Sequence, residues 1–227
     1  MKGIQLPLGV HLAERASFDS YFAGPNDQAV RALQGDAPLL LLYGPSGSGK
    51  THLLQALIRK DCDLRTCAYL PVHQLATENP LDATEGLEAA GLLCIDDVDA
   101  ALGHADWSEA LLRLLDARRA AGLRTVVAAA AAPERLEGLP DLRTRLAAGA
   151  VYGLKPLDDA QRAEFLRERA RARGLELPAD AATFLLARLP RDPGSLIAAI
   201  ESLDAALLAA QRPLTLAFVQ QWLRGAG

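Results

Sequence analysis

Five short apolar runs recur along the first two thirds of the chain, separated by segments whose apolar residues follow a helical period. The runs are residues 38–43, 67–72, 92–95, 125–130 and 151–154. Runs that are apolar throughout are typical of strands buried on both faces, as in a parallel sheet covered by helices. Helices are predicted between the runs, near residues 26–34, 51–58, 106–121 and 140–146. This alternation predicts an α/β domain with a five-stranded parallel sheet.

The pattern changes after Pro156, where the apolar runs stop and only helical periods follow. Asp158, followed three residues later by Gln161, is typical of a capping box at a helix start. Three more helices are predicted, between residues 178 and 189, from Pro193, and from Thr215. We therefore expect three parts: an extended tail of residues 1–10, an α/β nucleotide-binding domain of residues 11–155 and a small all-helical lid domain of residues 156–227.

Residues 44–51 join the first run to a helical segment and match the phosphate-binding P-loop pattern G-x-x-x-x-G-K-[ST]. Glycine has no Cβ, so such a loop can wrap an anion with its N–H groups pointing inward, and the following helix adds the positive end of its dipole. Lys50 is predicted to reach the β- and γ-phosphates, and the Thr51 hydroxyl to ligate Mg²⁺. The predicted nucleotide-binding residues here are Gly44, Pro45, Ser46, Gly47, Ser48, Gly49, Lys50 and Thr51.

An acidic pair, Asp96-Asp97, ends the third apolar run. Two aspartates after a strand are often a turn or a helix cap, but downstream of a P-loop they are typical of a Mg²⁺–nucleotide site. Asp96 is predicted to hold the Mg²⁺ shell. Asp97 is predicted to position or polarise an attacking water.

Composition narrows the function classes. The chain carries 24 Lys and Arg against 28 Asp and Glu, a net charge of −4, whereas DNA-binding proteins usually show a basic face. Direct sequence-specific DNA binding is therefore not expected. No apolar run approaches the ~20 residues that span a bilayer, and the start of the chain lacks a signal peptide's apolar stretch. We expect a cytoplasmic protein with no membrane partner.

The cysteines and histidines predict neither a disulfide framework nor a zinc site. Cys62, Cys67 and Cys94 are odd in number and form no C-x-x-C. The four histidines are scattered without metal-ligand spacing. Free thiols, two of them in or next to apolar runs, are the simpler interpretation.

Taken together, the ordered motifs resemble the AAA+ ATPase architecture. Within it, the chain resembles the replication-initiator branch and is similar to the DnaA-homologous regulatory inactivators, the Hda family. The resemblance covers nearly the whole length. The segments that carry it are Gln5-Leu6-Pro7-Leu8, Leu93-Cys94-Ile95-Asp96-Asp97, Gly138-Leu139-Pro140-Asp141-Leu142 with Arg145, and Leu154-Lys155-Pro156-Leu157. The initiator's helix-turn-helix and N-terminal interaction domains are not expected here.

The resemblance implies a regulator that stimulates ATP hydrolysis by the initiator DnaA while bound to the DNA polymerase sliding clamp. It implies an arginine finger at Arg145, acting in trans, and a lid arginine on phosphate at Arg191. It also implies clamp binding through Gln5, Leu6 and Leu8, and a bound ADP (or ATP) with Mg²⁺. Arg143 is a rival finger, because two residues turn a helix by roughly 200° and only one side chain can face a partner. The oligomeric state stays open, a homodimer included.

One departure from the family pattern bears on activity. The fourth apolar run normally ends in a polar residue that senses the γ-phosphate, but residues 128–132 are all alanine. Nucleotide binding is expected, and intrinsic ATP hydrolysis is expected to be slow. Two alternatives stay open: a true AAA+ ATPase such as a helicase loader or transposase helper, and a small-molecule kinase.

Overall fold

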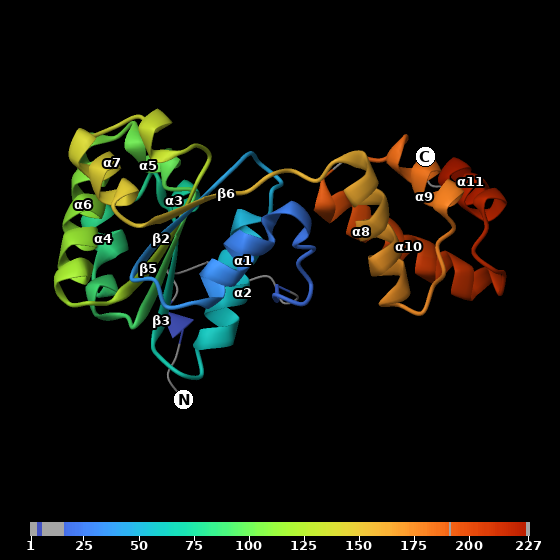
Figure 1. Ribbon diagram of the computed structural model, residues 1–227, viewed down its shortest axis with the longest axis horizontal. Coiled ribbons are helices and arrows are strands. Elements are labelled where there is room, and N and C mark those ends of the chain that lie inside the picture. The colour runs from blue at the N-terminus through green and yellow to red at the C-terminus, as the bar shows by residue number, and fades with distance from the viewer. Residues whose placement is uncertain (1–3, 6–15, 191, 226–227) are drawn as a thin grey trace. The chain divides into compact units, whose positions relative to one another are not determined.

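The computed structural model describes residues 4–5, 16–190 and 192–225. The chain divides into two compact units, Met1–Pro156 and Leu157–Gly227 (Figure 1). The first alternates strands and helices, and the described part of the second is helical. Every predicted nucleotide-binding residue except Arg191 belongs to the first unit.

A fully parallel sheet of six strands lies at the centre of the first unit, in the order β1-β3-β4-β5-β2-β6. The five predicted strands are all present, and the α/β class is confirmed. They are β2 (Leu39–Tyr43), β3 (Cys67–Pro71), β4 (Leu92–Asp96), β5 (Arg124–Ala129) and β6 (Ala150–Gly153). β2 is the last strand but one, between β5 and the terminal strand β6, so the P-loop that follows it starts at the carboxyl end of the strands beside β5 and β6.

The sixth strand, β1 (Ile4–Gln5), was not predicted. It pairs with β3 at the sheet edge, with Ile4 opposite Cys67 and Gln5 opposite Ala68. The sequence predicts an extended tail over residues 1–10, because Pro7 and Gly9 argue against a helix. The backbone of Ile4–Gln5 instead extends the sheet. Leu6 and Leu8 lie outside the described residues.

The strands β3, β4 and β5 are buried on both faces, which agrees with their apolar runs, whereas β6 is partly exposed. On β2, Leu40 and Leu42 join the core cluster that contains Leu53 of α2, while Leu41 joins the opposite cluster with Trp107 of α6. One face carries η1 (Gly24–Asn26), α1 (Asp27–Gln34) and α2 (Lys50–Asp61). The other carries α3 (Val72–Leu75), α4 (Pro80–Thr84), η2 (Leu87–Ala89), α5 (Asp99–Leu102), α6 (Ala105–Ala120), η3 (Pro133–Arg135) and α7 (Pro140–Ala147).

The second unit contains α8 (Asp159–Arg171), α9 (Ala179–Leu186), α10 (Pro193–Ala210) and α11 (Leu216–Gly225). The predicted capping box is confirmed: Asp158 Oδ1 accepts from the Gln161 N–H at 2.8 Å, and the Gln161 side chain accepts from the Asp158 N–H at 3.0 Å.

Among the described residues, α10 is the one helix whose length and composition would suffice to cross a membrane. It also buries Leu196, Ile200 and Leu203 in the lid core. Its Glu201 forms an ion pair with Arg173 of the lid at 2.7 Å. These are features of a core helix in a small helical domain.

Candidate nucleotide-binding site

The loop between β2 and α2 has backbone geometry that only glycine adopts easily. Gly47 and Gly49 have φ values of 76° and 93°, in the left-handed region that other residues avoid. A Cβ on Gly49 would also lie 2.5 Å from Cε2 of Tyr21, and one on Gly44 would lie 2.7 Å from the carbonyl oxygen of Leu154. The glycines are therefore required by conformation and by close approach.

Polar groups gather inside this loop, and they fit an anion. Lys50 is only 8% exposed, and its Nζ donates to the carbonyl oxygens of Gly44 at 2.7 Å and Pro45 at 3.2 Å. The Ser48 hydroxyl is buried and has no hydrogen-bond partner among the described residues. Such a group is costly to leave unpaired. A bound phosphate would supply both Lys50 and Ser48 with an acceptor.

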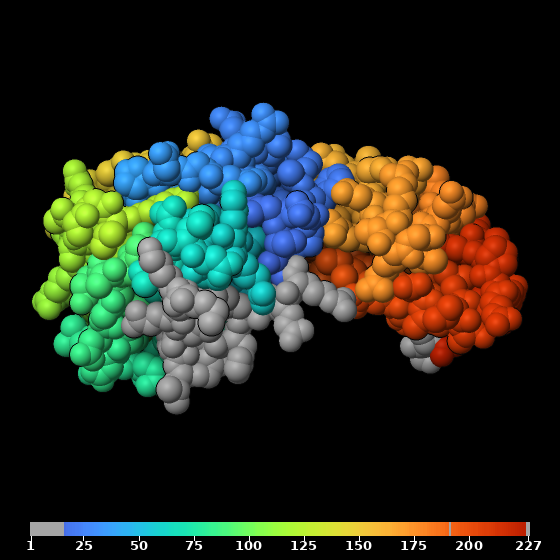
Figure 2. All heavy atoms as spheres, turned by 90° about the horizontal axis from the view of Figure 1, so that it is seen from below, coloured from blue at the N-terminus to red at the C-terminus, as the bar shows by residue number. Residues whose placement is uncertain are grey.

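The segment before α1 covers the loop, which the sequence analysis did not foresee. The Tyr21 hydroxyl donates to the carbonyl oxygen of Ser48 at 3.1 Å. The buried Asn26 amide donates to the Tyr21 oxygen at 3.1 Å and to the Lys155 carbonyl at 3.0 Å, and its Oδ1 accepts from the Lys155 N–H at 2.8 Å. In Figure 2 this segment, in blue, lies beside the cyan residues of α2. In the sequence, Gly24-Pro25-Asn26 is typical of a turn and gives no sign of these contacts.

Asp96 lies at the end of β4 and is 2% exposed. Its Oδ2 accepts a hydrogen bond of 2.6 Å from the Tyr69 hydroxyl, and its Oδ1 accepts from the Asp97 N–H at 3.1 Å. Tyr69 comes from β3, and nothing in its sequence context marked it as part of a site. The predicted acidic residue is thus held on both oxygens.

Asp97 adopts a left-handed backbone conformation with φ of 52°, uncommon for a residue other than glycine. Burial raises the pKa of its carboxyl above the usual range, and the nearby charges of Asp96 and Asp99 add to that rise. The positive charges of Lys50 and His73 act in the opposite direction. A partly buried carboxyl with a strained backbone beside the P-loop is consistent with the predicted role of Asp97 in positioning or polarising water.

The alanine-rich end of β5 lies directly beside the P-loop, because the Gly44 N–H donates to the Ala129 carbonyl at 3.2 Å. The Ala130 N–H donates to Asp99 Oδ1 at 2.6 Å. A carboxylate at the start of α5 therefore fixes the backbone at the end of β5. The side chains of residues 128–132 carry only methyl groups, so none can orient a water.

Mg²⁺ prefers oxygen ligands and commonly uses one or two protein groups together with phosphates and water. Asp96 and the exposed Thr51 hydroxyl, in the first turn of α2, supply such oxygens. Within the described ranges, no group of three or more His, Cys, Asp or Glu side chains could hold a metal ion. A Mg²⁺ bound here would take most of its ligands from the nucleotide and solvent.

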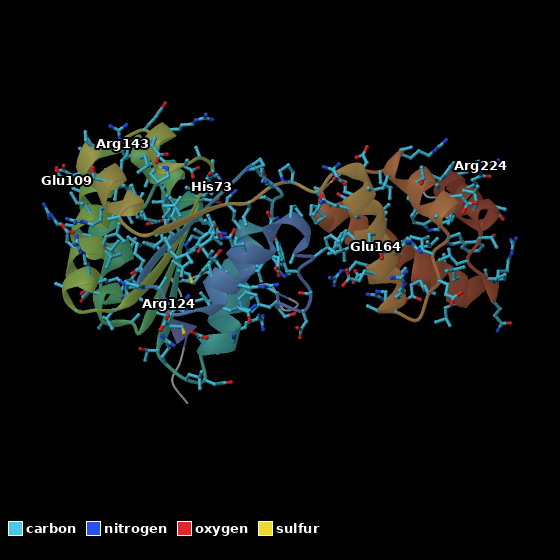
Figure 3. The ribbon with its side chains drawn as sticks, in the orientation of Figure 1. His73, Glu109, Arg124, Arg143, Glu164 and Arg224 are labelled. Atoms are coloured by element: carbon cyan, nitrogen blue, oxygen red, sulfur yellow. The ribbon has the colours of Figure 1, made fainter. Side chains whose placement is uncertain are left out.

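The two candidate finger residues diverge on α7. Arg145 Nε forms an ion pair with Asp116 Oδ1 of α6 at 2.5 Å, and the side chain lines a cavity with Pro38 and Gly149. These neighbours precede β2 and β6, so Arg145 lies at the amino ends of the strands. Arg143 Nη1 instead donates to the Leu136 carbonyl at 3.5 Å, and Figure 3 labels this residue on the ribbon. Arg191 lies outside the described residues.

Comparison with known proteins shows the family to which the chain belongs. A family model of the bacterial DnaA ATPase domain matches residues 12–153, and a model of the Hda lid domain matches residues 159–223. The chain belongs to the DnaA-homologous AAA+ family and carries an Hda-type lid. This confirms the resemblance inferred from the motifs. A member of this family is a DnaA-related AAA+ replication protein with a nucleotide-binding core.

One curated protein and several solved structures are similar to most of the chain. An uncharacterized protein of Haemophilus influenzae is 34% identical over 227 residues, covering 96% of this chain and 98% of its own. Domain III of DnaA from Thermotoga maritima superposes with a TM-score of 0.73 at 22% identity, covering 95% of this chain and 98% of that one. AMPPCP-bound DnaA from Aquifex aeolicus has a TM-score of 0.71 at 19% identity, with coverage of 85% and 66%. At such identities the structures show the fold, which is AAA+ as predicted.

Proposed function

We propose that this protein is an ADP-bound negative regulator of chromosomal replication initiation. It binds the DNA polymerase sliding clamp and supplies Arg145 to stimulate ATP hydrolysis by the initiator DnaA. Membership of the DnaA-homologous family and the Hda-type lid support the proposal. The observation that carries it is the position of Arg145 relative to the chain's own P-loop.

Arg145 and the P-loop lie at opposite ends of β2. The P-loop follows Tyr43, the last residue of the strand, whereas Arg145 lines a cavity with Pro38 and Leu39 at its first residues. Five residues of strand span about 16 Å, further than an arginine side chain reaches. Arg145 therefore cannot serve the nucleotide of its own subunit, but it can serve a neighbour's. A guanidinium supplied in trans stabilises charge on a transferring phosphoryl group and is worth ~10³–10⁵ in rate.

ADP as a lasting ligand fits the nucleotide site. The loop is complete, and its Ser48 and Lys50 side chains are buried, which favours retention of the phosphates. The end of β5 offers only methyl groups and a backbone already bonded to Asp99. Slow turnover follows from the lack of a side chain to orient water there. Asp97 stays the candidate for any residual water activation, and Arg191 is proposed as the lid residue that contacts phosphate.

Clamp binding is proposed for Gln5, Leu6 and Leu8. Gln5 would hydrogen-bond the rim of a pocket on the clamp, and the two leucines would fill its apolar floor. Because the backbone of Ile4–Gln5 pairs with β3, docking in an extended conformation would require this short strand to leave the sheet edge or to present the residues after it. A two-residue pairing is a small barrier.

The decisive experiment uses initiator loaded with labelled ATP, clamp on DNA, and this protein as wild type, Arg145→Ala or Arg143→Ala. Arg145→Ala is expected to bind clamp and ADP normally yet leave the initiator's ATP unhydrolysed. Arg143→Ala is the matched control and should keep most of the stimulation, since its side chain points elsewhere. Full stimulation by Arg145→Ala would remove this finger from consideration.

Two further measurements separate the proposed regulator from an AAA+ ATPase such as a helicase loader or transposase helper. Replacing Gln5, Leu6 and Leu8 together by alanine should abolish clamp pull-down without changing the melting temperature. Pure wild-type protein should hydrolyse ATP slowly. Robust turnover that Asp97→Asn abolishes would favour the ATPase interpretation instead.

A further inference from the structure

The strand β3 contributes a side chain to the nucleotide site. In the sheet register Tyr69 lies opposite Cys94 and Pro71 lies opposite Asp96. Side chains alternate along a strand, so Asp96 points to the same face as Cys94. Tyr69 and Cys94 both belong to the core cluster on the α2 face. Asp96 is thus the diagonal neighbour of Tyr69, a distance that an aromatic side chain bridges.

The contact between the two is short and buried. The Tyr69 hydroxyl donates to Asp96 Oδ2 at 2.6 Å, and each residue is 2% exposed. That length is typical of a charge-assisted bond between a hydroxyl and a carboxylate. A tyrosine phenol is ordinarily protonated at neutral pH and an ionised carboxylate only accepts, so Tyr69 is the donor in this bond.

The same hydroxyl also links the carboxylate to the P-loop helix. Gln55 Nε2 of α2 donates to the Tyr69 oxygen at 3.4 Å, and Gln55 lies one helical turn after Thr51. On its other side, Asp96 Oδ1 accepts from the Asp97 N–H. One hydrogen bond on each oxygen fixes the plane of the carboxylate, while each oxygen keeps acceptor capacity for a Mg²⁺ shell.

We infer that Tyr69 is a positioning residue for Mg²⁺ at this site, orienting Asp96 toward the metal shell of a bound nucleotide. The inference rests on the proposed role of Asp96 and is independent of any regulatory role. Outer-shell partners of metal-binding carboxylates typically contribute 10–100-fold to metal affinity. A phenylalanine would fill the same core volume, so the hydroxyl can be removed without emptying the core.

The test is a titration of Mg²⁺ into the ADP-loaded protein, read by the fluorescence of a labelled ADP. Wild type, Tyr69→Phe and Asp96→Asn are compared, with Tyr152→Phe as a control for loss of a hydroxyl from a ring packed on the same cluster. Tyr69→Phe should weaken apparent Mg²⁺ affinity about tenfold and leave ADP affinity in EDTA within about twofold of wild type. Tyr152→Phe should match wild type in both.

The variants separate the role of Tyr69 from the role of Asp96. If Asp96→Asn weakens Mg²⁺ binding and Tyr69→Phe does not, the inference is overturned and the role of Asp96 stands. If Asp96→Asn leaves Mg²⁺ binding unchanged, the role of Asp96 fails and the inference with it. Equal losses of ADP affinity with and without Mg²⁺ in Tyr69→Phe would make the tyrosine structural and would also overturn the inference.

Discussion

Replacing Arg118 by methionine should destabilise the nucleotide-binding unit more than any surface substitution on the same helix. Arg118 is fully buried on α6. Its guanidinium donates to the carbonyl oxygens of Leu87 at 2.7 Å, Ala90 at 2.8 Å and Arg124 at 2.6 Å, and to the Thr125 hydroxyl at 2.9 Å. These acceptors flank the starts of β4 and β5, so one side chain ties the two strands together at their amino ends.

The magnitude follows from the acceptors left behind. Methionine fills similar volume but donates nothing, and each buried carbonyl left unpaired costs about 1–3 kcal/mol. Part of this loss is offset, because Arg118 has only neutral acceptors and its burial lowers the pKa of the guanidinium to about 10. With three buried carbonyls left unpaired and part of the loss offset, we expect a net loss of about 3–5 kcal/mol. For a unit of this size that corresponds to a fall in melting temperature of roughly 10 °C.

Urea unfolding followed by tryptophan fluorescence is a suitable assay, since Trp107 is buried on the same helix. A Trp222→Phe background confines the signal to that unit. Arg113→Met is the matched control: Arg113 is exposed on α6 and pairs with Glu109 at 3.3 Å, so its loss should cost under about 1 kcal/mol. If Arg118→Met is no less stable than Arg113→Met, water must satisfy the freed carbonyls and the reasoning is wrong.

Three further predictions concern the nucleotide site. Lys50→Ala should abolish ADP binding in a fluorescence titration, because it removes the loop's buried ammonium; retained affinity would mean that the backbone alone suffices. Asp97→Asn should raise the melting temperature at neutral pH, because the raised pKa of Asp97 in the folded state means that its ionisation opposes folding. This advantage should be lost as the pH falls toward the ordinary pKa range of a carboxyl group. An equal effect of the substitution at all pH values would contradict this prediction. Gly49→Ala should destabilise the fold by at least about 1–2 kcal/mol, because alanine disfavours the left-handed backbone conformation at this position. Adding Tyr21→Ala should restore only the part of the stability that is lost to the clash with the tyrosine ring. Full restoration would show that the backbone conformation costs nothing.

The sequence by itself determined the class of the fold and the phosphate-binding loop. Both depend on local rules: continuous apolar runs such as residues 39–43 indicate strands buried on two faces, and the spacing of Gly44, Gly49 and Lys50 needs only a strand before it and a helix after it. The capping box at Asp158 is equally local, since both of its hydrogen bonds join residues three apart. The short helices α3, α4 and α5 went unpredicted because four or five residues carry no readable period.

Only the tertiary structure decided what surrounds the loop. Tyr21 reaches Ser48, Asn26 reaches Lys155, and Tyr69 reaches Asp96 across 27 or more positions of sequence. Each is a polar side chain that burial forces to find a partner, and the identity of that partner depends on strand order and register. The pairing of Arg145 with Asp116 also joins residues far apart in the sequence, on α7 and α6. The sequence shows which residues can form hydrogen bonds, whereas the order of the strands in the sheet determines which of them come into contact.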